Sequence, residues 1–261
     1  GVILNIVTSP TAKMRARSIR LRAKPIDSTD ETTSRGGERL RDVLLIALTV
    51  ASGAVDAISY FGLGRTFSAF MSGNIVFLAF DIANLRATAV LPVVVALCVF
   101  GAGAYLGHRI WTLRSHESGL WTPTVSVLLV LVASAETGFL ALWAETARQP
   151  STLIAAILLA LFSLAMGIQT AAVRSLGVQG VFTTAATFTL VALAGVFAGA
   201  RPNAEMPRLI GVLVGLVLGA VCGGLLFLHA RSYAPILPLT ITVLVILVGL
   251  VGLAPRRQSP P

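Results

Sequence analysis

From residue 43 onward the sequence is a succession of long apolar runs joined by short connections, and this pattern restricts the fold more than any other feature. An α-helix needs about 20 apolar residues to cross the hydrocarbon core of a bilayer. Only 12% of the residues are charged, whereas soluble domains average about 25%. The runs also lack the apolar–polar alternation of membrane β-strands. The sequence therefore predicts an all-α integral membrane protein.

Eight apolar segments are candidate membrane helices, and each is about long enough to span. They cover residues 43–61, 67–84, 87–107, 122–143, 150–173, 181–200, 209–228 and 233–254. The second segment is the shortest and the most polar. Two topologies are open: either all eight segments cross, or the second and the sixth enter the membrane and return on the same side. We therefore expect a polytopic helical bundle of about six to eight transmembrane segments.

The first 42 residues differ in composition from the rest, since they hold nine of the 20 Lys and Arg residues. Lys and Arg mark the cytoplasmic ends of membrane helices, and no basic face interleaves with aromatic residues as in nucleic-acid binders. We expect a basic, disordered cytoplasmic tail at 1–42, a membrane domain at 43–254 and a short C-terminal tail at 255–261. Both termini then lie in the cytoplasm of a cell whose inner membrane holds the chain. A basic arm on anionic lipid is an alternative for the N-terminal tail.

Glycines recur at helical spacing in two of the segments. Gly211, Gly215, Gly219 and Gly223 follow one another every four residues, and Gly103 and Gly107 form a similar pair in the third segment. This spacing lines one helix face with no side chains, so another backbone can approach closely. It predicts tight helix packing, within the chain or between copies, so a homo-oligomer stays open.

Two stretches of the chain repeat each other. Residues 50–79 read "VASGAVDAISYFGLGRTFSAFMSGNIVFLA" and residues 163–194 read "SLAMGIQTAAVRSLGVQGVFTTAATFTLVALA". The alignment pairs Gly53 with Gly167, Asp56 with Thr170, and Asn74 with Thr189. Because polar positions agree as well as apolar ones, we expect two repeated halves, at about 43–143 and 150–254.

Each half carries a polar triplet inside an apolar run: Ser72-Gly73-Asn74 in the first, and Thr187-Phe188-Thr189 in the second. Irregular backbone at membrane depth is tolerated only where protein or a water-filled cavity satisfies it. Transporters built from two halves bind their substrate near the bilayer midplane, on helices that break. The triplets are therefore candidates for paired helix breaks that face each other and bind a solute.

Three acidic residues lie within apolar segments, and Asp81, near a segment end, is the least surprising of them. A carboxylate at the bilayer centre costs at least about 2.5 kcal/mol, so it marks a functional site by default. Asp56 is a candidate proton carrier, cation ligand or hydrogen-bond anchor for the second helix, and Glu136 in the fourth segment follows the same logic or has a structural role. Gln169 and Thr170 occupy the place of Asp56 in the second half, where they either bind a polar ligand or join helices.

The repeated motifs resemble those of the YoaK family, a group of bacterial membrane proteins of unknown function. The first motif contains Gly53, Asp56-Ala57, Phe67 and Ser72-Gly73-Asn74; the second contains Met166-Gly167-Ile168-Gln169-Thr170-Ala171-Ala172, Thr183-Thr184 and Thr187-Phe188-Thr189. The resemblance extends over about residues 44–254. It departs at Thr170, where the family has Asn, and at Phe188, where it has Gly. Phe lacks the backbone freedom of Gly, which counts against a break in the sixth segment.

No catalytic motif accompanies these residues: the chain has no H-E-x-x-H, no G-x-S-x-G and no phosphate-binding Lys loop. We expect no enzyme activity, no cofactor and no metal. The leading hypothesis is a secondary transporter or permease for a small solute, coupled to a proton or a cation through Asp56. The alternative is a non-transporting assembly factor or sensor packed through its glycine faces. In both cases the bilayer is the partner that composition requires.

Overall fold

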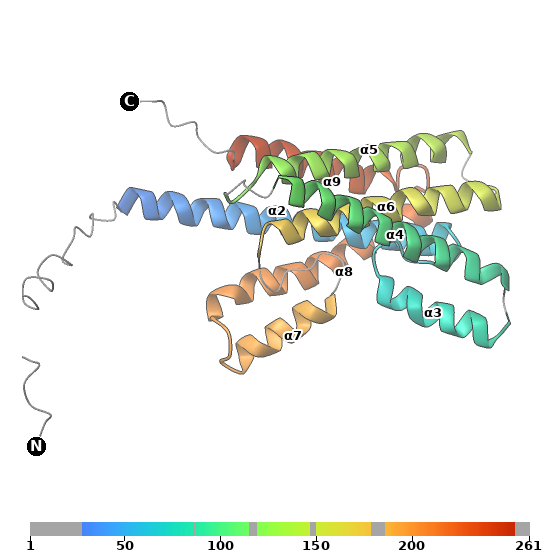
Figure 1. The fold of residues 1–261 in the computed structure, drawn as a ribbon, viewed down its shortest axis with the longest axis horizontal. Helices are drawn as coiled ribbons and strands as arrows, with labels where there is room; N and C mark the ends of the chain where they lie inside the picture. Colours follow the sequence, from blue (N-terminus) through green and yellow to red (C-terminus); the bar gives the residue numbers. More distant parts are fainter. Residues whose placement is uncertain (1–27, 86, 115–118, 147–149, 179–185, 254–261) are drawn as a thin grey trace, which may run out of the picture. The chain divides into compact units, whose positions relative to one another are not determined.

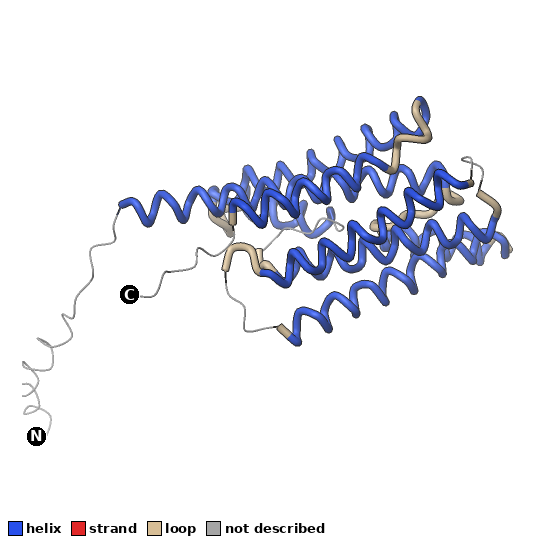
Figure 2. The backbone as a smooth tube through the Cα atoms, turned by 90° about the horizontal axis from the view of Figure 1, so that it is seen from above, coloured by secondary structure: helices blue, strands red, loops and turns tan. Residues whose placement is uncertain are grey.

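The computed structural model describes residues 28–85, 87–114, 119–146, 150–178 and 186–253. Within these residues the chain forms α-helices and one 3₁₀ turn, and no strand (Figure 1 and Figure 2). The elements are α2 (Ser28–Gly62), α3 (Met71–Ala83), α4 (Ala87–Leu113), α5 (Pro123–Glu145), α6 (Thr152–Ser175), α7 (Ala186–Phe197), η1 (Asn203–Glu205), α8 (Met206–His229) and α9 (Ile236–Gly252). The chain divides into the units Gly1–Gly37 and Glu38–Pro261, and the packing below is that of the second unit.

Five of these helices are long and apolar enough to cross a membrane: Arg35–Gly62, Val90–Leu113, Pro123–Glu145, Thr152–Ser175 and Asn203–His229. The 17 residues of α9 extend about 26 Å. The 13 residues of α3 and the 12 of α7 reach only about 20 and 18 Å, against a hydrocarbon core of about 30 Å. The expectation that each of the eight segments is long enough to span is therefore not confirmed for α3, α7 and α9.

The first helix begins much earlier than the apolar pattern indicates. It starts at Ser28, so residues 28–42 are helical and not disordered as their composition predicts. Residues 1–27 and 254–261, which include most of both predicted tails, lie outside the described residues.

The starts of α5 and α6 follow local sequence signals. Thr122 precedes α5 and its Oγ1 accepts a hydrogen bond from the Val125 N–H at 3.4 Å, while Pro123 occupies the first turn. Ser151 does the same for α6 through the Ile154 N–H, at 3.5 Å. Hydroxyl side chains at this position satisfy N–H groups that have no partner within the helix. These caps set where the two central helices begin.

The helices pack both against their neighbours in sequence and against helices further along the chain. α6 lies against both α4 and α5, α9 lies against α5, and the short helices α3 and α7 lie against α4 and α8 respectively. Figure 1 shows that α2 and α6 run in opposite directions and that α3 and α7 diverge from the middle of the bundle toward opposite ends. Each short helix thus packs on the long helix that follows it in the chain.

All six glycines singled out by their spacing lie at contacts between helices of the same chain. They are Gly103 and Gly107 of α4, which face α6, and Gly211, Gly215, Gly219 and Gly223 of α8, which face α2. A Cβ at Gly103 would lie 2.5 Å from the Leu164 carbonyl oxygen, and one at Gly223 would lie 2.6 Å from the Cα of Ala54. No side chain fits there, so the glycines allow these backbones to touch.

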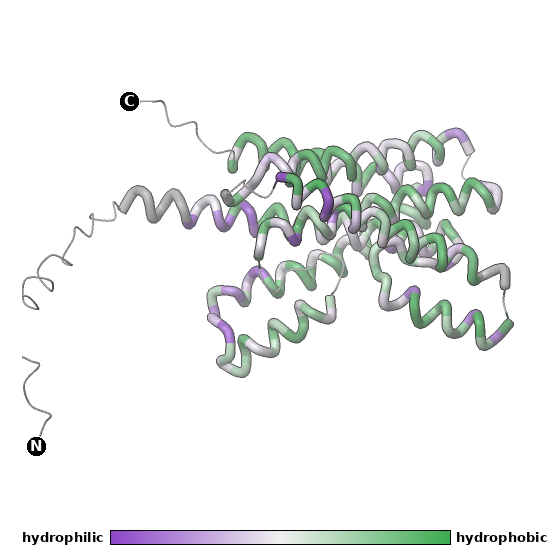
Figure 3. The backbone as a smooth tube through the Cα atoms, in the orientation of Figure 1, coloured by the Kyte–Doolittle hydropathy of each residue, from purple (hydrophilic) through white to green (hydrophobic). Residues whose placement is uncertain are grey.

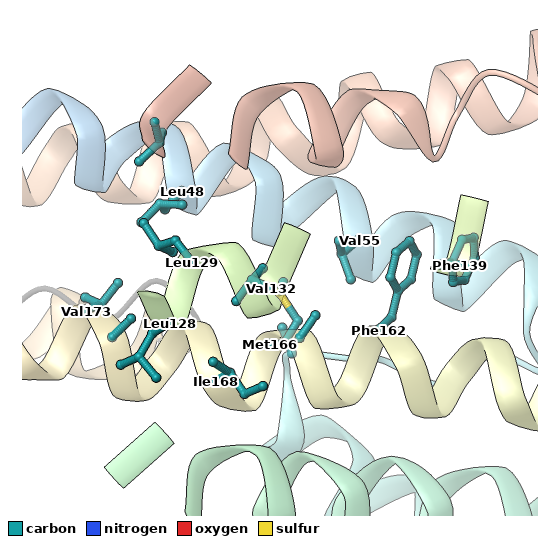
Figure 4. Close-up of a cluster of buried hydrophobic side chains, with 14 of the residues drawn as sticks. Leu48, Val55, Leu128, Leu129, Val132, Phe139, Phe162, Met166, Ile168 and Val173 are labelled. Carbon is teal, nitrogen blue, oxygen red and sulfur yellow. The ribbon is translucent and has the colours of Figure 1, made fainter. Parts of the chain in front are cut away.

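The core holds large apolar side chains from α2, α5 and α6 (Figure 4). Phe139 of α5 and Phe162 of α6 stack with ring centroids 3.6 Å apart. The outer surface is also apolar: Leu85, Leu153 and Val251 are 90, 72 and 88% exposed, and the helices are predominantly hydrophobic along their length (Figure 3). Water-soluble monomers rarely expose apolar surface this extensively, so the surface fits a lipid environment.

Candidate functional site

Asp56 lies in α2 and holds the chain that leads into α3. Its Oδ1 accepts hydrogen bonds from the backbone N–H groups of Ser68 at 2.9 Å, Ala69 at 2.7 Å and Phe70 at 3.4 Å. These N–H groups lie just ahead of the first turn of α3, where no carbonyl of that helix reaches them. A carboxylate is also favoured at a helix N-terminus by the helix dipole. Asp56 therefore acts as a cap that one helix provides for another.

Asn74 holds the same loop from the other side. Its Oδ1 accepts from the Phe67 N–H at 3.0 Å and its Nδ2 donates to the Phe67 carbonyl oxygen at 2.7 Å. The Ser59 and Ser68 hydroxyls add a contact of 2.6 Å between α2 and the loop. An amide suits Phe67 because it presents a donor and an acceptor side by side. The buried polar groups of this segment are thus satisfied by the protein itself.

The helix break predicted at Ser72-Gly73-Asn74 lies earlier, between the end of α2 at Gly62 and the start of α3 at Met71. The triplet belongs to the first turn of α3. Ser72 is exposed there, whereas a Cβ on Gly73 would lie 2.6 Å from the Phe70 ring. The break falls ahead of the triplet because Asn74 stabilises the irregular loop from within a regular turn.

The second half has its triplet in a corresponding place. Thr187-Phe188-Thr189 lies in the first turn of α7, with Thr187 and Phe188 exposed and Thr189 buried. Residues 179–185, the counterpart of the loop ahead of α3, lie outside the described residues. Each triplet therefore opens a short helix, and those helices start nearer the middle of the bundle than they end (Figure 1).

Gln169 and Thr170 have different surroundings. Gln169 is completely buried, and its Nε2 donates to the Leu48 carbonyl oxygen at 3.2 Å, which joins α6 to α2. Its Oε1 has no hydrogen-bond partner among the described residues. The Thr170 hydroxyl donates to the Met166 carbonyl oxygen at 2.8 Å within α6. Gln169 therefore joins α6 to α2 through its side-chain nitrogen, and its side-chain oxygen can still accept a hydrogen bond.

Glu136 is completely buried in α5, and neither of its carboxylate oxygens has a hydrogen-bond partner in the described part of the chain. The Thr242 hydroxyl of α9 faces it without forming a well-aligned hydrogen bond. Ser52 of α2 and Ser163 of α6 are likewise buried with an unpaired oxygen. Sequence reasoning passed over these three hydroxyls; their only signal is a single polar residue inside an apolar run.

Across the described ranges, no group of three or more His, Cys, Asp or Glu side chains could hold a metal ion. The arrangement instead divides into two parts: a loop held by Asp56 and Asn74, and buried polar atoms without partners on α2, α5, α6 and α9. The first part is structurally complete, whereas the second has free hydrogen-bonding capacity.

The helices, the lipid-compatible surface and the buried polar groups define a multi-pass α-helical membrane protein. The chain belongs to the family described as "Protein of unknown function (DUF1275)", whose sequence profile matches residues 44–249. It is 35% identical over 153 residues to the "UPF0700 transmembrane protein YoaK" of Bacillus subtilis (strain 168). That match covers 59% of this chain and 65% of the relative. No solved structure matches the chain. The resemblance to the YoaK family is thereby confirmed.

Proposed function

We propose that this protein is a secondary transporter or permease for a small solute in the cell (inner) membrane, with its site between two repeated halves. In this proposal α2, α4, α5, α6, α8 and α9 cross the membrane, while α3 and α7 re-enter it from opposite sides. The observation that carries the proposal is a pair of matching helix crossings, because transporters with inverted repeats place their site where the two halves meet.

The first crossing joins α2 to α8 and the second joins α6 to α4. A Cβ at Gly53 of α2 would lie 2.9 Å from the Ala220 nitrogen of α8, and one at Gly167 of α6 would lie 2.8 Å from the Ala104 nitrogen of α4. Gly53 and Gly167 are the residues that the sequence repeat aligns. The first helix of each half therefore crosses the third helix of the other half at the same position.

The reverse contacts match as well. Gly219 of α8 lies against the Val50 carbonyl oxygen, and Gly103 of α4 lies against the Leu164 carbonyl oxygen. Val50 and Leu164 each precede the aligned glycine of their helix by three residues. Such agreement at backbone contacts supports a repeat more strongly than apolar composition does, because composition alone does not set where two helices touch.

The short helices support the re-entrant topology. Neither α3 nor α7 reaches across the hydrocarbon core, and they diverge toward opposite ends of the bundle (Figure 1). With these two helices re-entering, both termini lie on one side, and the basic N-terminal region favours the cytoplasm. Broken helices near the midplane are typical of transport sites, and the loop held by Asp56 is such a break.

The same contacts weaken the alternative of an assembly factor or sensor. That alternative depends on glycine faces offered to a partner, but the chain's own helices α2 and α6 cover those faces. An assembly factor or sensor also gives no role to the buried unpaired oxygens of Gln169 and Glu136. A non-enzymatic transport role accounts for both features.

The proposal is tested by thermal unfolding of the purified protein in detergent against a library of small metabolites, ions and drugs. A ligand that binds only the folded state stabilises it by about 2.7 kcal/mol at a hundred times its Kd. We expect one solute class to raise the unfolding temperature saturably. Thr170→Val should reduce that shift, whereas Thr240→Val, which also removes a hydroxyl bonded within its own helix but exposed on α9, should preserve it.

Uptake of the stabilising solute into proteoliposomes then decides between transport and mere binding. Saturable uptake that requires the protein supports the transporter. If no solute class stabilises the protein, or if the one that does is bound without being taken up, the transporter proposal fails.

A further inference from the structure

Glu136 occupies the middle of a buried stripe on α5. Val132, Glu136, Phe139 and Trp143 recur at helical spacing and are each at most 1% exposed. Val132 and Phe139 point into the core cluster (Figure 4). Glu136 is thus a buried carboxyl group on an otherwise apolar stripe, near the centre of a membrane-spanning helix.

The carboxyl group has no donor to offset its burial. Both oxygens lack a hydrogen-bond partner among the described residues, and the only polar side chain known to face them is the Thr242 hydroxyl. An unpaired carboxylate is strongly disfavoured in an apolar interior, so the group takes up a counter-charge instead. That counter-charge is either a proton or a bound cation.

The surroundings favour a proton. A hard cation such as Ca²⁺ takes about six to eight oxygen ligands, whereas the Thr242 hydroxyl is the one side-chain oxygen of the described residues that interacts with the Glu136 carboxylate. The backbone carbonyls nearby belong to the regular helices α5, α6 and α9 and already accept hydrogen bonds within them. A proton needs only a carboxylate oxygen.

Among the described residues of α4, α6 and α9, and of α2 from Val43 onward, no charged group competes for this role, while Arg231 lies over the Trp143 ring at the far end of the stripe. α9 carries no titratable residue, and α6 carries only Arg174, which is exposed in its last turn. The titratable residues of α4 are Cys98, Tyr105, His108 and Arg109, none of which is buried, and those of α2 from Val43 onward are Asp56 and Tyr60. Asp56 already receives three backbone N–H groups, so losing its charge would weaken the loop that it holds.

We propose that Glu136 is the proton-binding group of this protein, and that its carboxylate takes up and releases the proton that drives solute movement. Asp56 is then a fixed anchor and not the carrier that sequence reasoning favours. The coupling to solute rests on the proposed function, whereas proton binding at Glu136 does not. When the carboxylate accepts a proton from one side, the neutral acid no longer carries a buried charge, which changes the balance between conformations open to either side.

Infrared difference spectroscopy of the full chain in lipid, recorded as the pH is changed, tests the proton site. We expect a protonated carboxyl band that shifts in D₂O, disappears as the pH rises, is absent in Glu136→Gln and persists in Asp56→Asn. An identical band in Glu136→Gln, or a band that never responds to pH while the protein is folded, would overturn the assignment. If Glu136→Gln does not fold, Thr242→Val serves instead: its band should disappear at a different pH, and an unchanged midpoint also overturns the assignment.

Uptake into proteoliposomes tests the proton coupling at Glu136 separately from solute transport itself. With the solute found in the unfolding screen, a pH gradient should accelerate uptake by the wild type but not by Glu136→Gln. If a gradient leaves wild-type uptake unchanged, the coupling is refuted while transport stands. If the wild type moves no solute although the band titrates, transport is refuted while the proton site stands.

Discussion

Replacing Asp56 by Ala tests the assignment of this residue as an anchor. The substitution removes the acceptor of three backbone N–H groups, two at 2.9 and 2.7 Å and one at 3.4 Å. Hydrogen bonds to charged groups contribute about 1.5–3 kcal/mol each, so the two short bonds together stabilise the loop by about 3–6 kcal/mol. Removing a buried charge offsets part of this loss. We therefore expect Asp56→Ala to lower the free energy of unfolding by about 2–4 kcal/mol.

Asp56→Asn should be the milder change, because the amide keeps one carbonyl oxygen to accept from Ser68 or Ala69. We expect a loss of about 1–2 kcal/mol for this variant. Equilibrium unfolding in mixed micelles measures both losses, and hydrogen exchange read by mass spectrometry shows whether residues 68–70 lose protection first. Ser72→Ala is the matched control, since Ser72 is exposed in the adjoining turn. An Asp56→Ala protein with wild-type stability and wild-type exchange in this loop would refute the reasoning.

The remaining predictions concern other contacts. Gly219→Leu should destabilise the protein by about 1–3 kcal/mol or more, because its side chain would overlap the Val50 backbone; Gly101→Leu should have little effect, since a Cβ there meets nothing within 4 Å. Equal unfolding midpoints for these two variants would argue against the helix crossing. Asn74→Ala should cost about 1–3 kcal/mol by leaving the Phe67 N–H and carbonyl without partners; unchanged exchange at Phe67 would show that the bonds do not hold the loop.

The sequence by itself determined the class of the protein. Apolar runs of spanning length predicted membrane helices because a backbone in hydrocarbon must satisfy its hydrogen bonds within the segment. The glycine spacing indicated which helix faces pack closely, and the polar residues within apolar runs identified Asp56, Asn74, Gln169 and Glu136 as unusual. These inferences rely on local chemistry, so one chain was enough to make them.

The hydropathy pattern of the sequence did not predict the lengths of α3 and α7. The segment that holds α3 is apolar over a longer range than the helix occupies, and hydropathy does not show where a chain stops being helical when tertiary contacts satisfy its backbone. In the first half, Asp56 satisfies three N–H groups located 12–14 residues further along the chain. The break therefore depends on an interaction between segments as well as on the residues at the break, where Gly64 adopts a φ of 87°.

Only the tertiary structure decided which of the two acids accepts hydrogen bonds from the backbone and which does not. Asp56 and Glu136 are chemically alike in sequence, each a carboxylate within an apolar helix. The fold brings backbone donors to Asp56, whereas it buries Glu136 beside the hydroxyl of Thr242, 106 residues later in the chain. A carboxylate's role depends on the donors that reach it, and in a folded chain distant segments provide those donors.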